Sequence, residues 1–327
     1  MTKSFQHTLL VILLIVSSSF STFFSGCEFD KIKSKTTVGN LDMTVDDTVE
    51  PLMKKEKAEY ERINPDARLL LTTLPTSNCM ADLLNNKTKI ITVTRDFDST
   101  EKRYISENKI DVKKYEIAID GVGFIVNNSN PVSRVTSEDL KKIFTGEFKN
   151  WTDIKAQDEE QNKSAKSYFT GSKGSIKVFI QRPNSTLYSY VKDSVMNKLD
   201  YVSSAVICST SAQMLQMVRE NNNSIGITNM AWLSAGNQDS MDATVKALRV
   251  SKILDNGVQK DFVQFHQGYI YNDTYPYRFS VFIMTTEGGI GLTTGFLSYI
   301  LKPDGQKVIL NNGLVPVSQP VRTIQLN

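Results

Sequence analysis

Apolar residues alternate between a strand period and a helix period along most of this chain, and this alternation constrains the fold more than any other feature. Leu41, Met43 and Val45 recur at every second position, which predicts a strand over residues 40–45. A helix with a proline in its first turn is predicted next, over residues 49–63. Further strands are predicted over residues 67–73, 89–94, 115–126, 176–180, 225–228, 247–251 and 278–284, and further helices over residues 80–84, 99–108, 136–144, 185–196, 211–219 and 291–301. Strands and helices that alternate at this spacing predict an α/β fold with a largely parallel sheet.

One internal stretch shows neither period. Residues 156–175 are polar and poor in apolar side chains, so we expect a loop there. The chain also lacks any repeat of solenoid length, which excludes the repeat architectures.

The N-terminus has the pattern of an export signal. Lys3 precedes an uninterrupted apolar run over residues 9–16, which is too short to span a bilayer permanently. Small residues lead up to Cys27, and the Ser-Gly-Cys ending resembles the lipobox of bacterial lipoproteins. The resemblance implies removal of residues 1–26 and lipid attachment to this cysteine. Several acyl chains would anchor the protein stably, and the polar residues 27–39 would form a tether. An ordinary secretory signal or a single membrane anchor is the alternative.

Charge and rare residue types exclude several classes of function. The formal charge is only +3 and no basic block is present, so we expect no nucleic-acid partner. Apart from Cys27, the cysteines are Cys79 and Cys208, which lie far apart and outside metal-ligand spacing; whether they form a disulfide stays open. His266 is the only histidine beyond the signal, which argues against zinc and a Ser-His-Asp triad. We expect a structural or surface role for His266, and no metal or cofactor.

An enzymatic function has little support in the sequence. Asp46 and Asp47 are adjacent on the end of a predicted strand, where neighbouring side chains point to opposite faces and do not form an acid–base pair. No Walker sequence, dinucleotide-binding glycine series or nucleophile elbow is present. We therefore expect that the protein is not an enzyme.

Several landmarks together resemble the phosphate-type solute-binding proteins of ABC importers, in the divergent version common among lipoproteins of the Bacteroidetes. The resemblance covers most of residues 40–323. Its pieces are Asp-Gly-Val-Gly-Phe-Ile-Val-Asn at 120–127, Leu-Lys-Lys-Ile-Phe-Thr-Gly-Glu at 140–147 with Asn150-Trp151, Asn-Met-Ala-Trp at 229–232, and the closing stretch 305–316. Each piece alone is weak, whereas their order and spacing make the match specific.

The resemblance implies a two-lobed type II periplasmic-binding fold with hinge crossover strands. One lobe would comprise residues 40–118 and 275–327, and the other would comprise residues 119–274. The ligand would lie in the cleft between the lobes, at strand ends and helix N-termini that present donors to an anion. The implied partners are phosphate or a related small oxyanion, an ABC importer permease, and a membrane that holds the lipid anchor. The implied form is a monomer in the cell envelope that faces the periplasm.

The same resemblance indicates the residues that would hold the anion. They are Thr48, Ser77, Arg95, Arg182, Asn184, Ser185 and Thr186. The threonine, serine and asparagine side chains could equally serve as helix caps, and Arg95 could form a salt bridge instead. Either Arg95 or Arg182 would supply the positive charge.

Two departures from the family pattern leave a second function open. Asp46 and Asp47 replace small residues in the first loop, and a Leu74-Pro75 pair stands where the family has glycines. Two carboxylates repel a dianion unless one accepts a proton from the ligand or pairs with an arginine. The alternative is therefore a sensor or interaction lipoprotein on the same fold, with an altered or lost ligand site.

Overall fold

The protein is described by a computed structural model over residues 35–154, 159–170, 174–236 and 240–318. The predicted signal peptide, Cys27 and the first part of the predicted tether lie outside these residues. Within the described ranges, no helix is long and apolar enough to cross a membrane.

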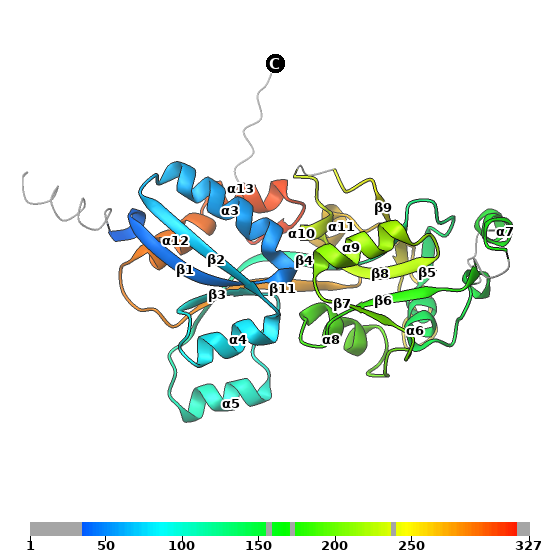
Figure 1. The fold of residues 1–327 in the computed structure, drawn as a ribbon, viewed down its shortest axis with the longest axis horizontal. Coiled ribbons are helices and arrows are strands. Elements are labelled where there is room, and N and C mark those ends of the chain that lie inside the picture. The colour runs from blue at the N-terminus through cyan, green and yellow to red at the C-terminus, as the bar shows by residue number, and fades with distance from the viewer. Residues whose placement is uncertain (1–34, 155–158, 171–173, 237–239, 319–327) are drawn as a thin grey trace, which may run out of the picture.

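The first lobe is built on a sheet whose first three strands are parallel. Its strands are β1 (Gly39–Asp46), β2 (Ala67–Leu74), β3 (Ile90–Val93), β11 (Arg278–Thr285), the first part of β4 (Lys113–Asn127) and β12 (Val315–Pro316), in the order β2-β1-β3-β11-β4-β12. Its helices are α3 (Glu50–Ile63), α4 (Thr76–Leu84), α5 (Ser99–Glu107), α12 (Leu292–Ile300) and α13 (Pro303–Asn311). In Figure 1, α3 and α13 lie on one side of this sheet, and α4 and α5 lie on the other.

The second lobe repeats this strand pattern. Its strands are the second part of β4, β6 (Lys177–Gln181), β7 (Val206–Cys208), β8 (Ser224–Asn229) and β9 (Val245–Ala247), in the order β7-β6-β8-β4-β9. A separate pair consists of β5 (Arg134–Thr136) and β10 (Arg249–Ser251). The helices are α6 (Ser137–Thr145), α7 (Glu159–Tyr168), α8 (Thr186–Ser194), α9 (Ser211–Glu220), α10 (Met230–Leu233) and α11 (Gln267–Tyr271). Short 3-10 helices are η1 (Asp47–Val49) and η2 (Trp151–Asp153).

Strand β4 belongs to both lobes. Residues 113–121 pair with β11 in the first lobe, and residues 122–126 pair with β8 in the second. In each lobe three parallel strands are followed by one antiparallel strand that crosses between the lobes, β11 in the first and β4 in the second. The predicted two-lobed α/β fold with hinge crossover strands is confirmed.

Three local predictions differ from the structure. The strand predicted over residues 247–251 is two short strands, β9 and β10, which pair with β4 and β5 respectively. Helix α4 begins at Thr76, four residues before the predicted start, because its first three residues, Thr76, Ser77 and Asn78, are polar and add nothing to an apolar period.

The stretch 156–175 contains α7, although a loop was expected. This helix has few apolar residues and is held by distant contacts: the Gln161 side chain accepts hydrogen bonds from the Ser133 and Arg134 backbone N–H groups at 3.0 and 3.1 Å. Such tertiary contacts leave no periodic signal in the sequence.

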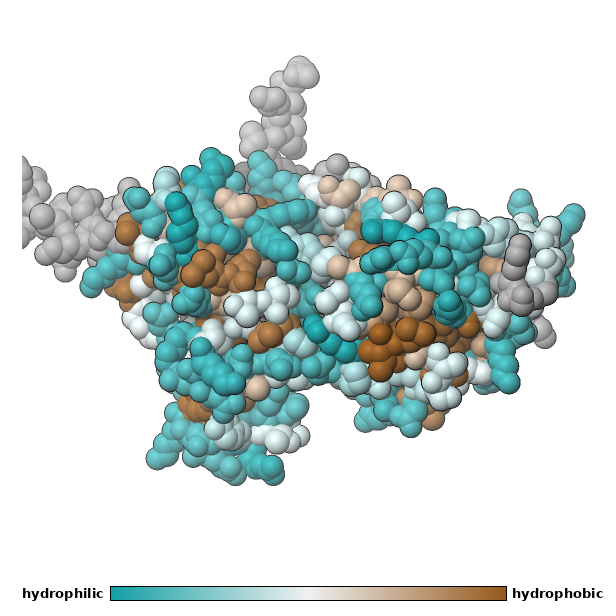
Figure 2. Space-filling view, viewed as in Figure 1, coloured by the Kyte–Doolittle hydropathy of each residue, from teal (hydrophilic) through white to brown (hydrophobic). Residues whose placement is uncertain are grey.

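The two edge strands of the large sheet expose apolar side chains. On β7, Val206 and Ile207 are 41% and 53% exposed, and on β2, Leu70 is 52% exposed. Figure 2 shows an apolar area over β6 and β7 on a face that is otherwise mostly hydrophilic. The core is continuous across β4, and a small separate cluster lies beneath α4.

Glycine is required in β4 for close packing. A Cβ added at Gly121 would lie 2.8 Å from atoms of Phe265 and Ile270, and one at Gly123 would lie 2.6 Å from the Phe265 ring. The two glycines therefore let the Phe265 ring lie against the backbone of the strand that the lobes share.

We expect Gly123→Ala to lower the free energy of unfolding by about 1–3 kcal/mol, because the added methyl group overpacks the contact with Phe265. Gly288→Ala is the matched control, since no heavy atom lies within 4 Å of the added Cβ and glycine's left-handed backbone is not needed there. Urea unfolding measures both. Equal stability of the two variants would contradict the packing argument.

Candidate functional site

The carboxylate of Asp46 lies at the C-terminal end of β1 and collects donors from three neighbouring segments. Its Oδ1 accepts a hydrogen bond from the Thr48 backbone N–H at 3.1 Å. Its Oδ2 accepts from the hydroxyls of Thr76 and Thr94 at 2.7 and 2.6 Å. Asp46 is only 1% exposed, and burial raises the pKa of its carboxyl despite these hydrogen bonds. The carboxylate is thus held in the manner of a small bound oxyanion.

Thr76 continues this network into the second lobe. Its Oγ1 accepts hydrogen bonds from the Thr186 backbone N–H at 3.1 Å and from the Thr186 hydroxyl at 3.0 Å. Because a hydroxyl has one proton and two lone pairs, Thr76 uses its full hydrogen-bonding capacity between Asp46 and Thr186. The donors of both lobes therefore converge on one point at the start of α4 and α8.

The second lobe also holds the loop that follows Asp46. Asp47 accepts hydrogen bonds through Oδ2 from the Ser211 backbone N–H at 2.9 Å and from the Ser211 hydroxyl at 2.7 Å, at the start of α9. The backbone carbonyl of Asp47 accepts from Trp232 Nε1 at 2.8 Å, and that of Thr48 accepts from Asn229 Nδ2 at 2.9 Å. The carboxylates of Asp46 and Asp47 have separate partners, in agreement with the prediction that they do not form an acid–base pair.

A second buried carboxylate, Asp120, links this loop to the shared strand. It accepts hydrogen bonds from the backbone N–H groups of Gly121, Met230 and Ala231 at 2.6, 2.9 and 3.3 Å. It also accepts from Asn229 Nδ2 at 2.7 Å, and the same amide group contacts the Thr48 carbonyl. Burial raises the pKa of Asp120 to about 6, opposed by these four donors. Asp120 thus connects β4 and the end of β8 to the loop that follows Asp46.

Other predicted site residues also meet across the lobes. The Ser77 backbone N–H donates to the Asn184 carbonyl at 3.3 Å, and Asn184 Nδ2 donates to Asn78 Oδ1 at 2.9 Å. The Ser77 side chain is exposed. Ser185 is the N-cap of α8, and its Oγ accepts from the Leu187 backbone N–H at 3.3 Å. Thr48, Ser77, Asn184 and Thr186 are therefore brought together, while Ser185 serves as a helix cap.

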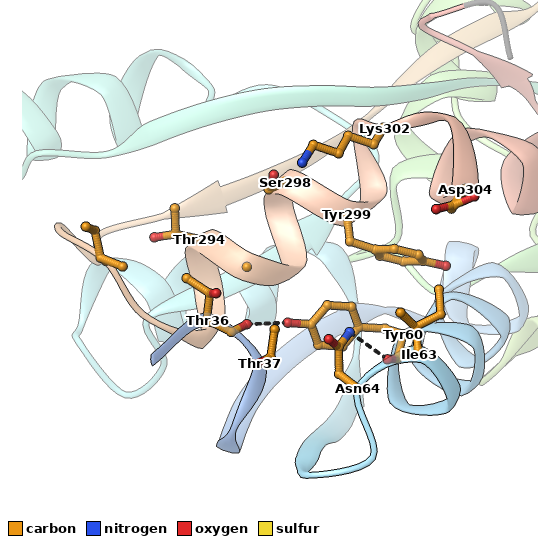
Figure 3. Close-up of a pocket in the computed structure, with 12 residues that line it drawn as sticks. Thr36, Thr37, Tyr60, Ile63, Asn64, Thr294, Ser298, Tyr299, Lys302 and Asp304 are labelled. Carbon is orange, nitrogen blue, oxygen red and sulfur yellow. Dashed lines mark hydrogen bonds between the residues drawn. The ribbon is translucent and has the colours of Figure 1, made fainter. Parts of the chain in front are cut away.

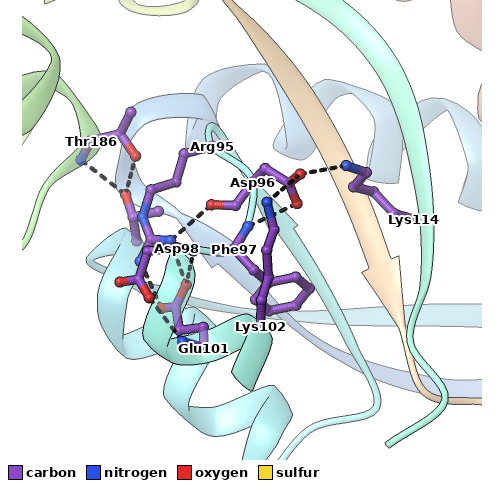
Figure 4. Close-up of polar contacts among 9 residues, drawn as sticks. Arg95, Asp96, Phe97, Asp98, Glu101, Lys102, Lys114 and Thr186 are labelled. Atoms are coloured by element: carbon purple, nitrogen blue, oxygen red, sulfur yellow. Dashed lines mark hydrogen bonds and ion pairs between the residues drawn. The ribbon is translucent and has the colours of Figure 1, made fainter. Parts of the chain in front are cut away.

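The two predicted arginines differ in their partners. Figure 4 shows the Arg95 guanidinium paired with Glu101, with two hydrogen bonds of 2.7 and 2.8 Å. Arg182 is half-buried and makes no ion pair with any residue that the structure describes. Its positive charge acts on the thiol of Cys79 in α4, as does the charge of Asp46. Of the two predicted arginines, Arg182 is therefore the one whose charge is not neutralised by an ion pair.

The remaining candidates lie outside this cluster. His266 is the N-cap of α11, with Nδ1 accepting from the Gly268 backbone N–H at 3.1 Å, so its structural role is confirmed. Cys79 and Cys208 are buried free thiols. In the described part of the chain, no group of three or more His, Cys, Asp or Glu side chains could hold a metal ion.

A cavity of about 410 Å³ opens on the first lobe, at a separate place. Figure 3 shows it between α3, α12 and the segment that leads into β1, where the Tyr60 hydroxyl donates to the Thr36 carbonyl at 2.6 Å. It shares no residue with the network around Asp46.

Sequence reasoning missed several residues of the network. Thr76 was missed because the start of α4 was predicted too late, although a proline such as Pro75 often stands near a helix start. Ser211 and Asn229 stand at the start of a predicted helix and at the end of a predicted strand, where an anion site in an α/β fold is expected. Thr94 is the last residue of a predicted strand and directly precedes the predicted site residue Arg95, yet it was missed.

The fold and this network define a two-lobed binding protein whose lobes meet around a cluster of hydrogen-bond donors. The sequence matches the family described as "PBP superfamily domain" over residues 33–304. Because the match covers most of the chain, the chain belongs to this family.

Relatives of known description are consistent with this membership. The phosphate-binding protein PstS of Pseudomonas aeruginosa is 22% identical over 303 residues, covering 88% of this chain and 86% of the relative. A protein from Clostridium perfringens, assigned as a phosphate ABC transporter substrate-binding protein and solved with bound phosphate, superposes with a TM-score of 0.68. The match has 20% identity and covers 86% of this chain and all of that one. An ABC-type phosphate transport receptor from Vibrio cholerae has a TM-score of 0.59 at 17% identity, covering 85% and 100%. The relatives are binding proteins and not enzymes.

We expect Asp47→Ala to shift the ligand-free protein toward an open arrangement of the lobes. The change removes two hydrogen bonds to a buried carboxylate, and each such bond contributes about 1.5–3 kcal/mol. Small-angle X-ray scattering should show a larger radius of gyration than for the wild type. Asp42→Ala, an exposed carboxylate on the same strand, is the matched control. Identical scattering of wild type and Asp47→Ala would show that this contact does not hold the lobes together.

Proposed function

We propose that this protein captures phosphate or a related small oxyanion and delivers it to the permease of an ABC importer. The observation that carries this proposal is the set of donors around Asp46, in which an N–H group and two hydroxyls already hold two anionic oxygens. The Thr186 backbone N–H and hydroxyl add donors from the other lobe at the start of a helix, where an anion is stabilised. The descriptions of the relatives from Pseudomonas aeruginosa and Vibrio cholerae support phosphate as the anion.

In this proposal the ligand lies between Thr48, Ser77, Asn184 and Thr186, with Ser185 at the start of α8. Arg182 supplies the positive charge, because Arg95 is already engaged by Glu101. The proposed lobes are residues 40–118 with 275–327, and residues 119–274, and their closure around the ligand is a hinge motion. The protein acts as a monomer.

The test is calorimetric titration of the protein lacking residues 1–27 with phosphate. We expect saturable heat, and at least a tenfold weaker affinity for Arg182→Gln, because a charge-assisted contact to the anion is lost. Arg103→Gln is the control, since Arg103 is an exposed arginine on α5 and its loss removes the same charge. Absence of both heat and a thermal shift at millimolar phosphate would contradict the phosphate proposal without affecting the fold.

We further propose that Cys27 carries the lipid that anchors the receptor to a membrane of the cell envelope, with the body facing the periplasm. The apolar run before Cys27 and the polar tether after it support this proposal. Several acyl chains are needed for stable anchoring, because a single chain binds only marginally.

For the anchor, we expect the native protein to partition into the detergent phase and Cys27→Ala to stay in the aqueous phase. Mass spectrometry of the mature N-terminal peptide should show a modified Cys27 as the first residue. An unmodified N-terminal peptide that begins elsewhere would indicate an ordinary secretory signal.

A further inference from the structure

The Asp46 carboxylate lies where the hydrogen-bond donors of the first lobe converge, beside the contact of Thr76 with Thr186 of the second lobe. It takes the Thr48 N–H and both the Thr76 and Thr94 hydroxyls, at 2.6–3.1 Å. Thr76 lies beyond the end of β2 and Thr94 follows β3, and these strands flank β1 on its two sides. The carboxylate is therefore at the centre of this sheet edge.

An external anion finds the first-lobe donors already in use. Thr76 has a single proton, which it donates to Asp46, while its lone pairs accept from Thr186. Thr94 also directs its proton to the same Asp46 oxygen. An oxyanion gains these hydroxyls only if they turn away from the Asp46 carboxylate.

The local charges oppose the simultaneous presence of the carboxylate and an anion. No lysine or arginine that the structure describes forms an ion pair with Asp46, and Arg95 is bound to Glu101. Two negative charges at contact distance repel each other much more strongly at the effective dielectric constant of a protein than in water. Asp46 and a bound dianion thus disfavour each other strongly.

We propose that Asp46 is a built-in competitor of the anion, one that holds the donors in the ligand-free cleft and weakens the binding of an external oxyanion. The inference rests on the proposed function, because it takes a small oxyanion as the class of ligand. In this proposal, Asp46 determines how tightly an oxyanion binds and how much negative charge the bound oxyanion carries.

The competition predicts a dependence on pH. The titratable and charged groups around Asp46 are Asp47 on η1, Cys79 on α4 and Arg95 after β3, with Arg182 acting on Cys79 from across the cleft. Burial raises the pKa of Asp46, and a nearby anion raises the pKa further. Anion binding then takes up a proton, so the affinity for an anion of constant charge increases as the pH falls from neutrality toward the pKa of Asp46.

The experiment is calorimetric titration of the protein lacking residues 1–27, its Asp46→Ala variant and its Asp46→Asn variant with inorganic phosphate and with sulfate. We expect Asp46→Ala to bind either anion roughly tenfold to hundredfold more tightly than the wild type. Asp46→Asn keeps the shape and an acceptor for the Thr48 N–H, so it separates the charge from the space that the side chain fills. Asp42→Ala removes an exposed carboxylate from the same strand and should bind as the wild type does.

The outcomes distinguish this inference from the proposed function. Binding by Asp46→Ala or Asp46→Asn but not by the wild type supports the competitor and contradicts phosphate capture by the native protein. Unchanged or weaker binding by both variants overturns the competitor, even if the wild type binds phosphate. Absence of binding by all three proteins overturns both proposals. Circular dichroism and thermal melting establish folding, and if Asp46→Ala fails to fold, Asp46→Asn decides.

Sulfate provides the pH test, because its charge stays constant over the range in which phosphate titrates. The affinity of the wild type for sulfate should increase as the pH falls from about 8 toward about 5. Titrations at intervals of about one pH unit cover this range. Asp46→Asn should show a flatter profile. Parallel profiles of the two proteins would overturn the assignment of the effect to Asp46.

Discussion

A carboxylate that is buried without a cation must be satisfied by hydrogen-bond donors, and Asp46 imposes this requirement on the segments that meet between the lobes. Its donors come from the start of η1, the start of α4 and the end of β3, so three strand ends must lie side by side. Leaving one such charge unsatisfied in the interior would cost several kcal/mol. The position of Thr76, and through it the approach of Thr186, follows from this one group.

The second lobe is coupled to the same loop by a different route. Asp120 lies where β4 passes between the lobes and accepts four hydrogen bonds, one of them from Asn229. The Asn229 amide also holds the Thr48 carbonyl, while Ser211 holds Asp47. A movement of the lobes about β4 therefore cannot leave the first loop unchanged, which gives a physical basis for coupling closure to the state of the proposed anion site.

Local patterns in the sequence predicted most of the regular structure. The period of two in β1 is a property of a short segment that persists in any context. Helix α7 was missed because its stability comes from Gln161 and from the contact of Phe169 with Trp151, whose rings stack at 5.9 Å. Contacts of this kind join segments that the sequence does not mark as neighbours.

The candidate site was predictable in its residue types but not in its pairings. The turns from strand to helix contain the hydroxyl and amide side chains of Thr48, Asn184 and Thr186. In an α/β fold, ligands bind at these turns, so the residue types could be predicted. The sequence could not show that Arg95 pairs with Glu101 whereas Arg182 makes no ion pair with any described residue and acts electrostatically on Cys79.

By itself, the sequence determined the α/β alternation, the membership of the family and the departure of Asp46 and Asp47 from the small residues expected at that turn. Only the tertiary structure decided that Asp46 receives the donors of the cleft and that Asp47 reaches Ser211 on the other lobe. The physical reason is that a donor's partner depends on the direction of its side chain and on which distant segment folds against it. Asp46 and Thr76 are 30 residues apart, and Asp47 and Ser211 are 164 residues apart. No local preference of the chain specifies such a pairing.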